Sequence, residues 1–160
     1  MKTSHHCALG VATLLLLSAC QCTSGTKQVT TPQETVSLKD PSMQKTDSGL
    51  LYVIEQECTG PQPRVGQKAT VHYTGRLYNG EGKELGPIFD SSKRRNDPFV
   101  FTVGVGQVIK GWDEAVLDMK VGEKRSVVLA PDLAYGARGA GNVIPPNATL
   151  HFEIELLDVK

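Results

Sequence analysis

Residues 106–116, GQVIKGWDEAV, decide how the chain can fold, because they carry the only tryptophan and the clearest helical period. Apolar side chains recur here at the spacing of one helix face: Val108, Ile109, Trp112, Ala115, Val116 and Met119. The pattern predicts a helix that begins near Val108 and ends at Gly122. Gly111 is unusual inside it, because glycine costs a helix up to about 1 kcal/mol relative to alanine. We hypothesise that Gly111 lets the backbone bend tightly at the helix start.

Segments of alternating polarity lie on both sides of this helix and predict strands. They are LLYVIEQE (50–57), KATVHYTGRLY (68–78), FVFTV (99–103), RSVVLA (125–130) and HFEIELLDV (151–159). The prediction is an α+β fold, in which an antiparallel sheet of about five strands packs one face against a single helix. Residues 48–160 are long enough to bury one hydrophobic core.

The N-terminal segment predicts export. Lys2 precedes an apolar run, residues 8–17, which is shorter than the roughly 20 residues that cross a bilayer. The run has the length of the apolar region of a secretory signal peptide. It ends in Leu-Ser-Ala-Cys (17–20), which resembles the lipobox of bacterial lipoprotein precursors. An ordinary signal peptide with a coincidental cysteine is the alternative.

The lipobox resemblance implies that residues 1–19 are removed before Cys20, whose acyl chains then anchor the protein in a lipid bilayer. Gln21, a residue other than Asp after the lipidated cysteine, favours the outer membrane of a bacterial cell envelope, facing the periplasm. Residues 20–47 are rich in Thr, Ser, Gln and Lys and show no apolar period. We therefore predict a lipidated, flexible tether before a single domain at 48–160.

Charge and cysteine content argue against several kinds of site. Lys+Arg and Asp+Glu both total 17, so the formal net charge is zero and nothing indicates nucleic-acid binding. We interpret the basic run at 93–95 as a solvated loop rather than a phosphate site. Cysteines and histidines lack metal-ligand spacing, so we expect no metal and no cofactor. Cys22 and Cys58 remain after cleavage, and the sequence favours two thiols over a disulfide between them. No dimerising helix is indicated, and we expect a monomer.

Six short motifs follow one another in the domain: VHYTG (71–75), FDSS (89–92), PF (98–99), VIKGW (108–112), AYG (134–136) and IPPNATL (144–150). Their order and spacing resemble the FKBP-type peptidyl-prolyl cis-trans isomerases over essentially all of 48–160, and the lipidated form resembles bacterial FKBP lipoproteins. The resemblance implies a twisted antiparallel sheet wrapped around one short helix. It also implies a pocket between helix and sheet, with Trp112 as its floor.

The resemblance further implies the site residues. The catalytic group is Asp90, Trp112, Tyr135 and Phe152, and the substrate-binding residues are Tyr73, Phe89, Arg95, Phe99, Val108, Ile109, Val143 and Ile144. Arg95 is expected to pair with Asp90, which either stabilises the turned carbonyl carbon or orients the site. The Ile109 N–H and the Tyr135 hydroxyl are the expected donors to substrate carbonyls. Phe152 is assigned equally to the core and to the pocket wall.

The implied activity requires no nucleophile. Partial double-bond character gives peptide rotation a barrier of about 18–20 kcal/mol, and an apolar pocket favours the twisted, less polar amide. We therefore expect a membrane-tethered isomerase that accelerates Xaa-Pro rotation in exported proteins and binds the macrolide inhibitors of the family. The alternative is a periplasmic or surface chaperone, or a host-interaction module, with weak turnover. Relative to the smallest family members, residues 81–87 are extra and 140–142 differ, and Gln107 replaces an acidic residue.

Overall fold

The computed structural model describes residues 42–80 and 85–160. The predicted signal peptide, Cys20 and most of the tether lie outside these residues. The elements are β1 (Gln44–Lys45), β2 (Leu51–Gln56), β3 (Lys68–Leu77), β4 (Ile88–Ser91), α1 (Ser92–Arg95), β5 (Phe99–Thr102), α2 (Lys110–Asp118), β6 (Lys124–Leu129), the 3₁₀ turns η1 (Pro131–Leu133) and η2 (Gly136–Arg138), and β7 (Leu150–Val159). No helix in the described part of the chain is long and apolar enough to cross a membrane.

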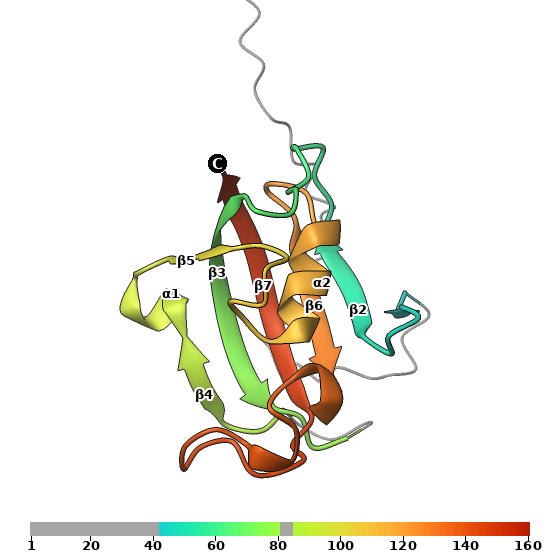
Figure 1. Ribbon diagram of the computed structural model, residues 1–160, viewed down its shortest axis with the longest axis vertical. Helices are drawn as coiled ribbons and strands as arrows, with labels where there is room; N and C mark the ends of the chain where they lie inside the picture. The colour runs from blue at the N-terminus through green and yellow to red at the C-terminus, as the bar shows by residue number, and fades with distance from the viewer. Residues whose placement is uncertain (1–41, 81–84) are drawn as a thin grey trace, which may run out of the picture.

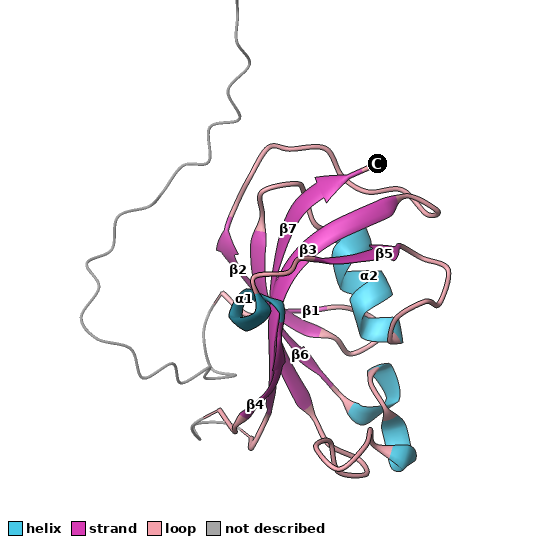
Figure 2. Cartoon of the chain, turned by 90° about the vertical axis from the view of Figure 1, so that its left-hand side faces the viewer, coloured by secondary structure: helices cyan, strands magenta, loops and turns pink. Residues whose placement is uncertain are grey.

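A single antiparallel sheet curls around α2 (Figures 1 and 2). Its strand order is β1-β2-β6-β7-β3-β4, and β5 also pairs with β3. The central strands β3 and β7 run side by side, with Tyr73 opposite Ile154 and Gly75 opposite Phe152. β7 occupies one edge of β3 along its whole length, so β4 and β5 share the other edge, with α1 inserted between them.

The predicted α+β fold, with an antiparallel sheet and one main helix, is confirmed. The five predicted strands correspond to β2, β3, β5, β6 and β7, whereas β1 and β4 were not predicted because they are too short to show alternation. β1 pairs with β2, so the sheet begins before the predicted domain boundary at Ser48. The helix begins at Lys110 rather than near Val108, because Ile109 is extended (φ −61°, ψ 148°) and forms the N-cap. It ends at Asp118, before the predicted end.

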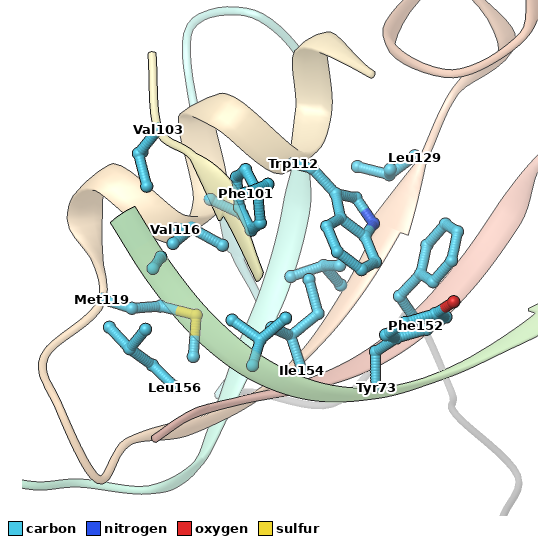
Figure 3. Close-up of a cluster of buried hydrophobic side chains, with 14 of the residues drawn as sticks. Tyr73, Phe101, Val103, Trp112, Val116, Met119, Leu129, Phe152, Ile154 and Leu156 are labelled. Carbon is cyan, nitrogen blue, oxygen red and sulfur yellow. The ribbon is translucent and has the colours of Figure 1, made fainter. Parts of the chain in front are cut away.

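The hydrophobic core lies between α2 and the concave face of the sheet. Figure 3 shows Trp112 and Val116 of α2, and Met119 just after it, facing the strand residues Tyr73 and Ile154. Val116, Met119 and Ile154 are completely buried. Full burial of such side chains contributes roughly 1.5–3 kcal/mol each, so packing of α2 on the sheet stabilises the domain by several kcal/mol. The helix α2 therefore lies at the centre of the core.

Gly111 is explained by packing and not by the hypothesised bend, which is wrong. It does not have the positive φ that favours glycine, and the turn into α2 is made by Ile109. A Cβ at Gly111 would lie 2.5 Å from Cδ2 and 3.0 Å from Cδ1 of Leu129 on β6. Real Cβ atoms do not approach other atoms this closely, so glycine allows α2 to lie close to β6.

Cys58 follows β2 and is almost completely buried. It is disulfide-bonded, so the prediction that it remains a thiol is wrong. It is the only cysteine in the described part of the chain, and its partner therefore lies outside that part.

Candidate active site

A cavity of about 390 Å³ opens between the start of α2 and the sheet. Its lining residues are mostly aromatic or aliphatic: Tyr73, Phe89, Asp90, Phe99, Gln107, Val108, Ile109, Trp112, Tyr135 and Phe152. Concave, mainly apolar sites of a few hundred Å³ with few polar groups are typical of small-ligand pockets. The cavity can therefore enclose a small apolar group, while its few polar groups fix the orientation of that group.

Aromatic rings in edge-to-face contact form the floor and walls. The Trp112 ring lies 4.9 Å from the Tyr73 ring at an interplanar angle of 77°, and 5.3 Å from Phe152 at 85°. Phe89 meets Phe152 at 5.6 Å and 87°. Such pairs contribute about 0.5–1.5 kcal/mol beyond their burial, so each ring fixes its neighbour. The pocket is a rigid aromatic surface, formed before any ligand binds.

Three polar side chains form a network at one side of the cavity. The Tyr73 hydroxyl donates a hydrogen bond to Oδ2 of Asp90, and Arg95 Nη1 pairs with Oδ1 of the same carboxylate. Arg95 Nη2 also donates to the Tyr73 hydroxyl at 3.1 Å. Both carboxylate oxygens are therefore engaged, which holds the Asp90 side chain in one orientation.

The short helix α1 returns the chain so that Arg95 reaches Asp90. Ser91 is its N-cap and accepts a hydrogen bond from the Arg94 N–H at 3.4 Å. The hydroxyl of Ser92 accepts from the Tyr73 N–H at 2.8 Å and so holds α1 against β3. The predicted loop at 93–95 is thus wrong, because these residues are helical, whereas their predicted exposure to solvent is confirmed.

The network sets the charge of each member. Partial burial raises the pKa of Asp90, but hydrogen bonds from Tyr73 and Arg95 lower it, and the net pKa lies below its ordinary value. Burial, followed by the neighbouring Asp90, raises the pKa of both Tyr73 and Tyr135. At neutral pH the site therefore presents a carboxylate beside two neutral hydroxyl donors.

The loop before α2 delivers the remaining polar groups. Asp113, in the first turn of α2, accepts hydrogen bonds from the backbone N–H groups of Gly104 and Gly106, each at 2.8 Å. These bonds fix the loop that leads to Ile109, whose own N–H has no acceptor among the described residues. Ile109 lines the cavity, so its N–H is available to a ligand carbonyl.

Sequence reasoning missed two contributors. It assigned no role to Asp113, although an acidic residue in the first turn of a helix is a recognisable signal. It noted Gln107 only as the replacement of an acidic residue, whereas Gln107 lines the cavity and accepts a hydrogen bond from the Thr102 N–H at 2.7 Å. That contact joins two backbone segments and has no sequence pattern.

All the predicted pocket residues line the cavity except Arg95, Val143 and Ile144. Arg95 acts on the site through Asp90. Val143 is 58% exposed on the neighbouring loop, whereas Ile144 is buried in the core cluster and pairs with Ala140. Phe152 belongs both to the core and to the pocket wall, which resolves the equal assignment. No group of three metal-binding side chains occurs within residues 42–80 and 85–160.

Comparison with known proteins agrees with this geometry. The sequence profile of the FKBP-type peptidyl-prolyl cis-trans isomerases matches residues 60–157. FK506-binding protein 1 of Dictyostelium discoideum is 54% identical over 112 residues, covering 70% of this chain and 99% of that protein. Peptidyl-prolyl cis-trans isomerase Fkbp12 of Drosophila melanogaster is 53% identical over 98 residues, 61% of this chain and 85% of that protein.

Among solved structures, FkpA from Escherichia coli superposes with a TM-score of 0.66 at 37% identity, covering 76% of this chain and 53% of that one. The region matched by the family profile covers more than half of the chain and contains every residue that lines the cavity. The chain therefore belongs to the family of FKBP-type peptidyl-prolyl cis-trans isomerases.

Proposed function

We propose that this isomerase is a lipid-anchored protein of the bacterial cell envelope, which accelerates Xaa-Pro rotation in exported polypeptides. The observation that carries the catalytic part is the aromatic cavity beside the hydroxyl of Tyr135 and the N–H of Ile109, which has no acceptor in the described part of the chain. An Xaa-Pro segment needs an apolar surface for the ring and donors for its flanking carbonyls, and this cavity offers both.

Catalysis then follows from the polarity of the cavity. The proline ring packs on Trp112 between the Tyr73 and Phe152 rings, while Ile109 and Tyr135 hold the adjacent carbonyls. The planar amide carries more charge separation than the twisted one, so apolar walls raise the ground state relative to the transition state. Each 1.36 kcal/mol of such differential stabilisation increases the rate tenfold.

Asp90 contributes by its position and charge. Its lowered pKa argues against proton donation, and both of its oxygens are already engaged by Tyr73 and Arg95. The carboxylate fixes the Tyr73 wall and places a negative charge at the edge of the cavity. We therefore assign it to orientation of the site, the second of the two roles considered from the sequence.

The anchoring part rests on the N-terminal sequence. The Leu-Ser-Ala-Cys motif after a short apolar run supports cleavage before Cys20 and its acylation, and Gln21 supports an outer-membrane location facing the periplasm. The proposed ligands are proline-containing polypeptides and macrolides of the FK506 kind, the latter because a curated relative is named for FK506 binding. The proposed oligomeric state is a monomer.

The test measures cis-to-trans exchange of a short Xaa-Pro peptide with residues 20–160 carrying Cys20→Ser, beside a D90V/Y135F double variant. Acceleration that collapses in the variant supports an isomerase that uses this cavity. Trp112 fluorescence reports ligand binding in the same samples. Quenching without acceleration would favour a chaperone or binding module. Incorporation of labelled palmitate into the full-length protein, and its loss in C20S, tests the anchor separately.

A further inference from the structure

Cys58 lies in the connection between β2 and β3, which packs against the C-terminal end of α2. The active site lies at the other, N-terminal end of this helix. Gln62 Nε2 donates to the Leu117 carbonyl at 2.8 Å, and the Val121 N–H donates to the Pro61 carbonyl at 3.0 Å. A Cβ at Gly60 would overlap the Val121 carbonyl, so the loop and the end of α2 are in direct contact. Whatever is bonded to Cys58 is therefore held in a fixed relation to the helix.

A second cavity, of about 400 Å³, adjoins Cys58. Its wall contains Arg125, which pairs with the equally buried Glu123 and with Asp118, and whose guanidinium lies 4.6 Å from the centre of the Tyr52 ring. These fixed contacts leave a hollow beside Cys58, with room for a short stretch of polypeptide. The disulfide of Cys58 thus joins the domain to another segment at a preformed surface.

We propose that this segment is the tether, joined through Cys22, and that the link holds the acylated N-terminus against the Cys58 side of the domain. The proposal rests on the lipid anchoring proposed above. The chain has four cysteines, so the candidate partners are Cys7, Cys20 and Cys22. Cleavage before Cys20 discards Cys7, and acylation blocks the sulfur of Cys20, which leaves Cys22.

Formation of the link is ordinary disulfide chemistry of an exported protein. Each thiol loses one proton, and the two electrons pass to a disulfide-containing oxidant, an exported dithiol oxidase or a small-molecule disulfide, by thiol–disulfide exchange. The oxidant is released as a dithiol or as two thiols, and one S–S bond joins Cys22 to Cys58.

The link changes the reach and the orientation of the domain. As a random coil, residues 21–41 would give a root-mean-square reach of roughly 25 Å. With the link, only Gln21 lies between Cys20 and the attachment point at Cys22, a span of about 7 Å at most. The nine residues of α2 separate that point from the active site by about 13 Å. Figures 1 and 2 show the β2–β3 connection at the C-terminal end of α2 and the turns η1 and η2 beyond its N-terminal end. The cavity thus faces away from the bilayer.

The experiment uses the full-length, lipidated protein in vesicles of phosphatidylethanolamine and phosphatidylglycerol. Limited trypsin cleaves the tether after Lys27 or Lys39, between Cys22 and the domain. We expect the wild-type domain to sediment with the vesicles after cleavage and to be released only by dithiothreitol. The matched C22S variant should release its domain without reductant. Release of the wild-type domain without reductant would overturn the proposal.

Two further measurements separate the proposal from the anchor. Failure of the uncleaved wild-type protein to bind vesicles would instead reject the lipid anchor. In an exported C20S protein, non-reducing peptide mass spectrometry should find the Cys22 peptide joined to the Cys58 peptide, and a free Cys58 would reject the link. Trp112, the only tryptophan, should be quenched less by headgroup spin labels in the wild type than in C22S. Equal quenching would reject the orientation.

Discussion

Replacing Gly111 with alanine is the sharpest test of how the helix is seated on the sheet. The added methyl would lie 2.5 Å from Cδ2, 3.0 Å from Cδ1 and 3.2 Å from Cγ of Leu129, which is completely buried. Overpacking of this kind costs about 1–3 kcal/mol, whereas alanine regains at most about 1 kcal/mol of helix propensity. We expect a net destabilisation of about 1–2 kcal/mol, or a melting temperature lower by roughly 4–8 °C.

The assay is a double-mutant cycle of G111A and L129A, followed by urea unfolding and by peptide exchange. L129A alone should cost about 2–5 kcal/mol, because it leaves a cavity. In the double variant the new methyl enters that space. The sum of the costs of the two single substitutions should therefore exceed the loss of stability measured for the double variant by at least about 1 kcal/mol. Exchange should slow in G111A, since Trp112 moves with the adjacent backbone, and should recover partly in the double variant.

Two results would refute this reasoning. Additivity of the two substitutions to within about 0.5 kcal/mol would mean that Gly111 and Leu129 do not compete for space. An unchanged free energy of unfolding in G111A would mean that the helix has room for a side chain.

Three further predictions concern Asp90, Tyr135 and Arg125. The folded-state pKa of Asp90 lies below the unfolded value of about 3.9, so the charge of Asp90 stabilises the fold fully above about pH 4, and this stabilisation is lost as pH falls through the folded pKa. The unfolding free energies of wild type and D90N should therefore converge at acid pH. A constant difference between them would contradict the lowered pKa. Tyr135→Phe should leave stability within about 0.5 kcal/mol, because this side chain is 40% exposed, but should lower kcat/KM about fivefold, as expected for one hydrogen bond. Arg125→Ala leaves Glu123 as an unpaired buried charge and should cost about 3–5 kcal/mol in urea unfolding, with a smaller loss in R125M/E123Q and normal exchange by the folded protein.

The sequence predicted the long strands because alternation is readable only over many residues. β3 and β7, ten residues each, were found in this way. β4 has four residues and β1 has two, so neither presents enough of a period to be recognised. The start of α2 was misplaced by two residues, because Val108 and Ile109 continue the apolar period while their backbone is still extended.

The site was predictable where the family motifs are present in the sequence. The resemblance implied Trp112 as the floor of the pocket, and Trp112 does line the cavity. The position of Arg95 depends on the turn made by α1, and the contribution of Asp113 depends on two backbone N–H groups in a loop. The family resemblance implied that Ile144 lines the pocket, but its side chain is buried in the core cluster. Such outcomes depend on tertiary geometry, which a local pattern does not contain.

The residues that form the floor of the pocket also belong to the hydrophobic core, and this limits how substrate preference can change. Tyr73, Trp112 and Phe152 lie in the core cluster as well as in the cavity, so a change to any of them affects folding and recognition together. The exposed rim is free of this constraint: Val143 is 58% exposed and Phe99 37%. New preferences for the residues around proline should therefore arise by substitution at the rim, while the floor keeps its affinity for the ring. The fold separates an invariant task, holding proline, from an adjustable one, selecting its neighbours.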